Sequence, residues 1–381
     1  MKVLLVGLSV LMIILMGCKT DKSPTSVLED PDPNGEEELL KAFRDSEEPG
    51  VVKVMSRNVY IGTNVGELLN APSIELIPLA VAAGWSNVLQ SNFSERAEAL
   101  VTEIEKTLPH LIGLQEMSKF YIQSPGDFLN GNQVPATEIA LDFIEILEAA
   151  LATRGLDYRV VKAVENADIE LPMINVQGDD ILLDDIRIKD HDVILARNDV
   201  VTSNEVAVTY DARLIIDDSL GIFIPRGYVA CNAQIGQISL LFANTHLESV
   251  DSIALRLSQV NQLLDAFANE SLPVVLVGDF NSPATFGASY LQVLSEGYAD
   301  VWIDNPLTYN SDGNTYGHKS DLRNESPNLF TRIDYIFAGP QGDPEIGEGF
   351  VLGDEVRDKT ANGLWPSDHA GVVSKLTYVV P

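Results

Sequence analysis

Short apolar runs and amphipathic stretches alternate along most of this chain of 381 residues, and their spacing predicts the secondary structure. Within the stretch 272–281, an apolar run is bounded by Pro273 and Gly278, which is typical of a strand buried on both faces. Further strands are predicted at 51–60, 110–114, 158–164, 192–197, 205–215, 228–235, 238–247, 332–338 and 372–379. Gly236-Gln237 predicts a hairpin turn between two of these strands.

Apolar positions at helical spacing predict three long helices. The first spans 94–108 with Ser94 as N-cap, the second spans 137–154 and ends at Gly155, and the third spans 251–269. Because hairpins are mixed with strand–helix–strand units, the pattern predicts an α/β protein with mixed sheets. The apolar run 74–85 has two interpretations, a lid or membrane-contacting loop and a short packed helix after Pro78, of which we favour the helix.

The first 50 residues differ in composition from the rest. Lys2 precedes an apolar run, 3–15, that is too short for a comfortable membrane span. Gly17-Cys18 follows, which resembles the lipobox of bacterial lipoproteins and implies cleavage before Cys18 and lipidation of its thiol. An ordinary signal peptide or a short anchor is the alternative. We expect a lipoprotein signal peptide at 1–17, an acidic flexible tether at 18–49 with a helical turn at 39–43, and one folded domain at 50–381. This predicts an exported bacterial lipoprotein, anchored at the cell envelope or surface through Cys18.

Charge and cysteine content exclude several functions. A formal net charge of −31 argues against tight, non-specific binding of nucleic acid, because that affinity comes from Lys and Arg, although it permits a nuclease with a small positive cleft. With Cys18 lipidated, Cys231 is the one remaining thiol, so we expect a buried core cysteine and no thiolate zinc site. The chain contains no Gly-x-Ser-x-Gly elbow, His-Glu-x-x-His motif or phosphate loop.

Polar residues stand where several predicted strands end, and ligands of open α/β sheets bind beyond the carboxyl ends of strands. The candidate site residues are Asn58, Glu116, His246, Asp279, Asn281, Asp334, Asp368 and His369. Taken alone, each also has a structural explanation. Asp279 and Asn281 could form an Asx-type turn, and Asp334 could pair with Arg332.

The order and wording of the motifs resemble the endonuclease/exonuclease/phosphatase superfamily, whose members look like deoxyribonuclease I. The motifs are Asn58, Gln115-Glu116, Thr245-His246-Leu247, Gly278-Asp279-Phe280-Asn281, Arg332-Ile333-Asp334-Tyr335 and Ser367-Asp368-His369. The resemblance implies a four-layer α/β/β/α sandwich, with two mixed β-sheets flanked by helices, and a catalytic domain at 50–381. It also implies hydrolysis of a phosphodiester or phosphomonoester by in-line attack of an activated water.

Mg²⁺ is the expected metal, with Mn²⁺ or Ca²⁺ as alternatives, because hard cations take oxygen ligands and keep positions for substrate phosphate oxygens. Glu116 is the natural first ligand, and the amide oxygen of Asn58 and the carboxylate of Asp368 are the further candidates.

The remaining site residues receive their roles from the resemblance. Asp279 would position or deprotonate the water, while Asn281 and His246 would hold the phosphoryl oxygens. His369 would be oriented by Asp334 and act as a charged donor, because a carboxylate partner favours the imidazolium.

The substrate is less well defined by the sequence. Basic residues near the expected site are few, and the candidates for phosphate contact are Arg57, Lys119, Arg226, Lys319, Arg323 and Arg332. Because no basic stripe with interleaved aromatics is present, a lipid headgroup or small phosphoester is favoured slightly over a polynucleotide. The motifs do not separate nucleases from sphingomyelinases or inositol-phosphate phosphatases. A catalytically inactive, surface-tethered binding lipoprotein with the same fold is the alternative, against which the complete set of metal, water and phosphate residues weighs.

Overall fold

The computed structural model describes residues 33–64, 73–131, 134–178, 180–217, 222–249, 252–305 and 313–380. The expected signal peptide, Cys18 and the first part of the expected tether lie outside these ranges. By its internal contacts the chain divides into Met1–Leu39 and Leu40–Pro381, and the second unit contains both large sheets and the candidate site. None of the described helices is long and apolar enough to cross a bilayer.

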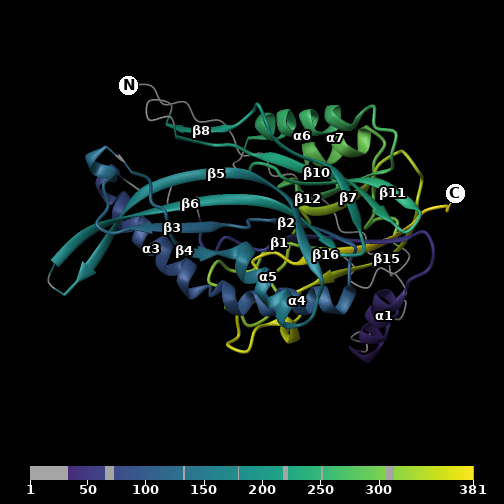
Figure 1. Ribbon diagram of the computed structural model, residues 1–381, viewed down its shortest axis with the longest axis horizontal. Coiled ribbons are helices and arrows are strands. Elements are labelled where there is room, and N and C mark those ends of the chain that lie inside the picture. The colour runs from purple at the N-terminus through teal and green to yellow at the C-terminus, as the bar shows by residue number, and fades with distance from the viewer. Residues whose placement is uncertain are drawn as a thin grey trace, which may run out of the picture. The chain divides into compact units, whose positions relative to one another are not determined.

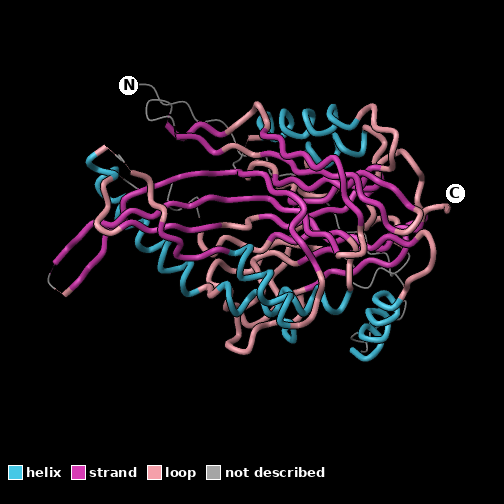
Figure 2. The backbone as a smooth tube through the Cα atoms, viewed as in Figure 1, coloured by secondary structure: helices cyan, strands magenta, loops and turns pink. Residues whose placement is uncertain are grey.

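Two mixed β-sheets form the centre of the larger unit (Figures 1 and 2). The eight-stranded sheet has the order β15-β16-β1-β2-β6-β3-β4, with β5 paired to β6. Its strands are β1 Val51–Asn58, β2 Leu111–Gln115, β3 Lys119–Gln123, β4 Glu138–Asp142, β5 Tyr158–Gln177, β6 Asp180–Arg197, β15 Glu345–Leu352 and β16 Gly371–Thr377.

The six-stranded sheet has the order β13-β14-β12-β11-β10-β7. Its strands are β7 Val201–Thr209, β10 Gly227–Ile235, β11 Ile238–His246, β12 Val274–Asp279, β13 Ala299–Asp300 and β14 Asp334–Ala338. A separate two-stranded sheet consists of β8 Leu214–Asp217 and β9 Ile222–Ile224.

Helices cover both outer faces of the sheet pair. The helices are α1 Pro33–Asp45, α3 Ile77–Gln90, α4 Phe93–Thr107, α5 Phe143–Thr153, α6 Ile253–Phe267 and α7 Ala288–Ser295. Figure 1 places α3, α4 and α5 on the side of the eight-stranded sheet, and α6 and α7 on the side of the six-stranded sheet. The predicted four-layer sandwich is therefore confirmed. Helix α1 begins within the expected tether and includes the predicted helical turn at 39–43, with Leu40 and Phe43 buried.

Apolar side chains fill the space between the sheets, as the strand patterns require. Val54 and Leu111 from one sheet share a buried cluster with Phe242 and Val275 from the other. Cys231 belongs to this cluster, as predicted. A second cluster joins the outer face of the six-stranded sheet to α6 and α7.

Asn244 is a polar exception at the contact between the two sheets. Its Nδ2 donates to the carbonyl oxygens of Leu114 (2.9 Å) and Val193 (3.0 Å), both on the opposite sheet. Its Oδ1 accepts from Gln115 Nε2 at 2.6 Å. A Cβ on Gly113 would lie 2.7 Å from that Oδ1, so a glycine there lets the Asn244 side chain cross between the sheets.

Most of the predicted elements are confirmed. The hairpin 228–235/238–247 has Ile235 paired with Ile238, and the long apolar run is β12. The run 74–85 lies mainly in α3, whose buried Val81 packs with Met173 and Ile186 of the β5–β6 hairpin. The packed-helix interpretation was therefore right.

Three predictions about element boundaries were wrong. The helix expected at 137–154 begins only at Phe143, because the preceding residues pair with β3 as β4 and Asp142 caps the helix by accepting from Glu145 N at 3.2 Å. The strand expected at 205–215 is divided between β7 and β8. Ser94 is not the N-cap of α4, which begins at Phe93, a ring that stacks on Phe143 at 3.7 Å between centroids.

The β5–β6 hairpin is much longer than its predicted ends. Its strands have 20 and 18 residues, whereas the apolar pattern identified only 158–164 and 192–197. The intervening residues are rich in charge because they extend beyond the sandwich core (Figure 1). Strands β3, β9, β13 and β15 and helix α7 were not predicted.

Candidate active site

Strand pairing brings the predicted site residues together from distant parts of the chain. His246 pairs with Asp279 across parallel strands β11 and β12, and Asp279 pairs with Asp334 across antiparallel strands β12 and β14. On the other sheet, Asn58 pairs with Gln115, the residue before Glu116. Three strands of one sheet and two of the other therefore end at the same place.

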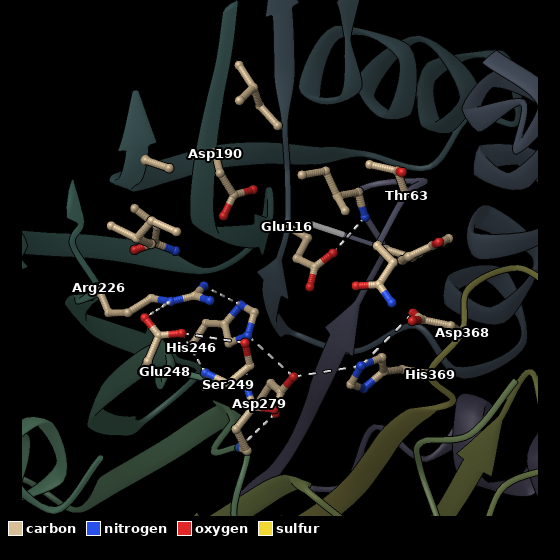
Figure 3. A pocket seen from close by; sticks show the side chains of 18 of the residues that line it. Thr63, Glu116, Asp190, Arg226, His246, Glu248, Ser249, Asp279, Asp368 and His369 are labelled. Atoms are coloured by element: carbon tan, nitrogen blue, oxygen red, sulfur yellow. Dashed lines mark hydrogen bonds and ion pairs between the residues drawn. The ribbon is translucent and has the colours of Figure 1, made fainter. Parts of the chain in front are cut away.

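A cavity of about 310 Å³ lies at these strand ends (Figure 3). Six of the eight predicted residues line it, namely Glu116, His246, Asp279, Asn281, Asp368 and His369. The other two, Asn58 and Asp334, are buried behind the lining and contact it through hydrogen bonds.

The backbone on either side of Asp279, which lines the cavity, has unusual conformations. Gly278 has φ +147°, and a Cβ there would lie 1.9 Å from the carbonyl oxygen of Thr245, so β11 and β12 can pair at this point only with glycine. Asn281 follows with φ 45° and donates its backbone N–H to Asp279 Oδ1 at 2.8 Å. The Asx-type turn and the functional interpretation are therefore compatible.

One carboxylate oxygen, Asp279 Oδ2, is the point on which several polar groups converge. Asn58 Nδ2 donates to it at 3.2 Å, and Nε2 of His246 and of His369 lie 3.5 Å and 3.8 Å away. Burial, followed by the neighbouring Asp334 carboxylate, raises the pKa of Asp279 to about 7, although His369 opposes the shift. A carboxylate with a pKa near neutrality is suited to accept a proton from water.

His369 has a carboxylate behind its ring. Its Nδ1 lies 2.9 Å from Asp334 Oδ2, which also accepts from Thr315 Oγ1 at 2.5 Å. Burial lowers the pKa of His369, but Asp334 and Asp368 outweigh burial and raise this pKa to about 10. The ring is therefore a cation at neutral pH. The alternative partner for Asp334 is excluded, because Arg332 pairs with Asp300 at 2.7 Å.

His246 has a guanidinium behind its ring instead. Arg226 Nη1 lies 3.2 Å from His246 Nδ1, and Asn281 Nδ2 lies 3.0 Å from Nε2 (Figure 3 for the arginine contact). Burial, then the charges of Arg226 and His369, lower the pKa of His246 well below its usual value. The ring is therefore neutral under conditions in which His369 is charged.

The residues predicted to bind a metal form an acidic group on one wall of the cavity. Glu116 Oε2 accepts from Ile61 N at 2.6 Å and Oε1 accepts from Asn58 Nδ2 at 3.1 Å. Burial and then Glu116 raise the pKa of Asp368 to about 6, against the opposing effect of His369. Two carboxylates that repel each other at a cavity wall suit a hard cation, so Glu116 and Asp368 fit Mg²⁺ chemically.

Asn58, which was predicted to bind the metal, contacts two carboxylates of the site in this structure. Its amide nitrogen contacts Glu116 and Asp279, while its Oδ1 accepts from Tyr60 N at 3.0 Å. Asn58 therefore positions two carboxylates, and its role as a metal ligand stays a prediction. Ligand atoms of Asp279, Asp334 and His369 also lie within 4.8 Å of one another, but His369 and Asp334 are already bonded to each other.

Comparison with known proteins agrees with this geometry. Residues 84–369 match the profile of the endonuclease/exonuclease/phosphatase family. The chain belongs to this family. A search of curated proteins finds no match.

Solved structures of the family share the fold at low sequence identity. An endonuclease/exonuclease/phosphatase family protein from Bacteroides thetaiotaomicron is 17% identical with a TM-score of 0.56, and the alignment covers 87% of this chain and 99% of that one. A mannosyl-6-phosphatase from the same species is 17% identical with a TM-score of 0.55, covering 86% and 100%. A family protein from Leptotrichia buccalis is 15% identical with a TM-score of 0.54, also covering 86% and 100%.

Two buried arginines have structural roles at this site that the sequence analysis did not predict: Arg96 was not singled out, and Arg57 was considered only for phosphate contact. Arg96 is fully buried and donates to the carbonyl oxygens of Tyr60 and Pro366, both at 3.0 Å, which joins the loop after β1 to the loop that carries His369. Arg57 pairs with Glu103 at 2.9 Å and donates to the His369 carbonyl. A buried arginine on an amphipathic helix, such as Arg96 among the apolar positions of α4, is the signal that could have identified the first.

Of the six basic residues considered for phosphate contact, Arg226 alone lines the cavity. Three of the others are bound to carboxylates elsewhere, since Lys119 pairs with Asp142, Arg332 with Asp300 and Arg57 with Glu103. Thr315, the second partner of Asp334, follows a segment with no recognisable motif and could not have been predicted.

Proposed function

We propose that this protein is a divalent-metal-dependent phosphoesterase that hydrolyses its substrate by in-line attack of water. Membership of the family supports phosphoester hydrolysis. The arrangement around Asp279 Oδ2 is the observation that supports attack by an activated water. An oxygen that faces Asn58 and two histidines is placed to orient a water and to accept its proton. The two imidazoles lie on either side, where they can donate to phosphoryl oxygens.

The chain's own residues then have separate tasks. Asp279 orients and deprotonates the water, His246 and Asn281 bind non-bridging oxygens, and His369 donates a charged hydrogen bond to the scissile phosphate. A cation held by Glu116 and Asp368 would supply charge neutralisation of the phosphate. Mg²⁺ is the first choice, and Mn²⁺ and Ca²⁺ share its preference for oxygen ligands.

The proposed substrate is a small phosphoester or a lipid headgroup. Arg226 is the single Lys or Arg among the described residues that line the cavity, and it already faces Glu248 at 3.6 Å. Five carboxylates line the same cavity: Glu116, Asp190, Glu248, Asp279 and Asp368. This lining suits one phosphate better than the repeated phosphates of a polynucleotide, which require several basic contacts.

The proposed location is the bacterial cell envelope, with the protein held at a membrane through lipidated Cys18. The support for it is the sequence alone, which has a charged start, an apolar run of 3–15 and Gly17-Cys18. Labelling with a radioactive fatty acid in the source cell, with Cys18→Ala as the control, tests it. A protein that is labelled equally in both forms would contradict it.

The test of function is a panel of DNA, RNA, sphingomyelin, phosphoinositides, sugar phosphates and nucleotides, assayed with Mg²⁺, Mn²⁺ or Ca²⁺ and with a chelator. We expect hydrolysis of at least one small or lipid phosphoester and its loss with the chelator. Glu116→Ala and His369→Ala should be inactive but folded, whereas Glu325→Ala, which removes an exposed carboxylate elsewhere, should be fully active. No hydrolysis across the panel would favour the inactive binding protein, and an active Glu116→Ala would exclude the proposed metal site.

A further inference from the structure

The contact between Arg226 and His246 defines which nitrogen of the ring carries a proton. A guanidinium has only donors, so the His246 Nδ1 that lies 3.2 Å from Arg226 Nη1 must accept. In a neutral imidazole the other nitrogen then carries the hydrogen. The ring is therefore the Nε2–H tautomer, and its N–H faces the cavity and Asp279 Oδ2 at 3.5 Å.

Asn281 is a second donor next to the ring, on the side of Nε2, and competes with Arg226 for the choice of tautomer. Its Nδ2 donates to the carbonyl oxygen of Leu247 at 2.9 Å, which identifies that atom as nitrogen. The same Nδ2 lies 3.0 Å from His246 Nε2. If Nε2 accepted from Asn281, the Nδ1–H would point at the charged Arg226, and two donors would oppose each other in a buried place. In the Nε2–H tautomer the ring N–H instead lies 3.0 Å from the Asn281 amide, which opposes it less strongly because that donor is uncharged and the guanidinium is not.

Arg226 is itself held in place from several sides. Its Nε lies 3.6 Å from Glu248 Oε2, a carboxylate that is almost fully buried just after β11. Helix α6 fixes this segment, because Gln259 Oε1 accepts from Glu248 N at 2.9 Å. The backbone of Arg226 is fixed too, since its carbonyl oxygen accepts from Tyr210 N at 2.8 Å. The guanidinium therefore has little freedom to turn away from His246.

The consequence is a pair of neutral N–H donors on the cavity wall. His246 Nε2 and Asn281 Nδ2 lie 3.0 Å apart, and in the assigned tautomer neither accepts from the other. Two adjacent donors of this kind are both satisfied by one anionic oxygen placed between them. The charged groups that face His246 are Arg226, Asp279 and His369; burial, then the two cations, lower the pKa of His246, so the ring stays neutral.

We propose that Arg226 is a positioning residue that fixes His246 as the Nε2–H tautomer, which makes this imidazole a neutral hydrogen-bond donor to a phosphoryl oxygen and excludes it as an acid or base. The phosphoryl part of the inference rests on the proposed function, whereas the tautomer and its dependence on Arg226 do not.

The tautomer can be measured without any substrate. Long-range ¹H–¹⁵N correlation spectra of the full-length chain with ¹⁵N-labelled histidine distinguish protonated from bare ring nitrogens, and His246→Gln assigns the signal among the five histidines. We expect a protonated Nε2 and a bare Nδ1 for His246, unchanged from about pH 5 to about pH 9. A His246 that carries its proton on Nδ1, or on both nitrogens, overturns the proposal.

Variants of Arg226 test whether it sets this state. Arg226→Lys keeps a donor and should keep the tautomer and rescue activity, whereas Arg226→Met should give a mixture of tautomers and lower kcat roughly tenfold or more with a smaller change in KM. Arg187→Met removes the same charge from an arginine that pairs with Asp168 and does not line the cavity, so it should leave the His246 spectrum unchanged.

A second variant guards against misfolding. Because Arg226→Met leaves Glu248 buried beside an apolar group, the double variant Arg226→Met/Glu248→Gln removes both charges and should show the same mixed tautomers. If either variant retains a pure Nε2–H signal and full kcat, Arg226 has no positioning role. The two proposals can fail separately. If the wild-type protein shows the Nε2–H signal, Arg226→Met loses it, and the wild-type protein hydrolyses no substrate, the positioning role of Arg226 is supported and the proposed function is contradicted.

Discussion

His246 and His369, two of the histidines that line the cavity, have opposite surroundings. His369 has a carboxylate at Nδ1, Asp334 at 2.9 Å, and is held as a cation. His246 has a guanidinium at Nδ1, Arg226 at 3.2 Å, and is held neutral. Both rings direct Nε2 at the same oxygen of Asp279. The side chain that contacts Nδ1 thus determines whether the histidine is a charged or a neutral hydrogen-bond donor. A motif that specifies only the histidine does not predict its charge.

Removal of each ring should have the largest effects and should separate the two roles. We expect His369→Ala to lower kcat/KM roughly 10⁴-fold, because a charged donor at the scissile phosphate is lost, and His246→Ala roughly 10²-fold, because one neutral donor is lost. Steady-state kinetics on the substrate identified in the panel measure both. Equal losses would show that the difference in charge has no role in the reaction.

Replacing each histidine with glutamine tests the same difference in charge between His246 and His369, with a smaller expected effect. A glutamine amide is a neutral N–H donor, so His246→Gln should recover roughly tenfold of the activity that His246→Ala loses. His369→Gln should be as inactive as His369→Ala, because no amide supplies the positive charge. Comparable rescue at both positions would contradict the assignment of charge to His369 alone.

The carboxylate behind His369 should control the basic limb of the pH profile. The pKa of His369 is raised to about 10, chiefly by Asp334 and Asp368 against the effect of burial, so activity that needs the imidazolium is retained below that pH and lost above it. Asp334→Asn removes one negative charge and should move the basic limb to lower pH, with a loss of kcat of roughly tenfold or more at neutral pH. Thr315→Val, which removes the other hydrogen bond to Asp334, should shift the limb less. A basic limb that stays in place in Asp334→Asn would contradict the role of that carboxylate.

The smallest effect is expected on the acidic limb. Burial and Asp334 raise the pKa of Asp279 to about 7, and the carboxylate is the active form, so activity should rise with pH through this region. A divalent cation near the group favours the charged form, so saturating Mg²⁺ should move the limb to lower pH. Profiles at low and saturating Mg²⁺ measure the shift. A limb that moves to higher pH with Mg²⁺ would argue against Asp279 as the titrating base.

Structural features that depend on a local pattern of residues were predicted from the sequence. Features that depend on contacts between distant parts of the chain were not. The strands that end at the site were predicted because a buried strand such as β12 shows its apolar run directly in the sequence. The β5–β6 hairpin was mostly missed, because its outer part extends beyond the core and has no such run. Helix α5 was predicted too long because residues 138–142 pair with β3, a tertiary contact that local propensity does not contain.

The same distinction holds within the site. All eight predicted residues lie at or directly behind one cavity, since each one stands at a strand end or in the loop before β16. Asp334 was predicted as the partner of His369, but the other partners could not be predicted. Arg226 is 20 residues before His246, and Thr315 is 19 residues before Asp334, in segments without a motif. Both histidines and the charge on His369 were therefore predictable from the sequence, but the neutral state of His246 was not.

The Asn244 amide, which joins the two sheets, should affect the temperature at which the protein loses activity. Asn58 and Glu116 belong to one sheet, and His246 and Asp279 to the other, so a small lateral slip would separate the two halves of the catalytic machinery while every strand stayed intact. The hydrogen bonds from Asn244 to Leu114 and Val193 oppose that slip. Weakening them, as in Asn244→Ala, should therefore produce a protein that loses turnover several degrees before it melts, an inactivation that is reversed on cooling.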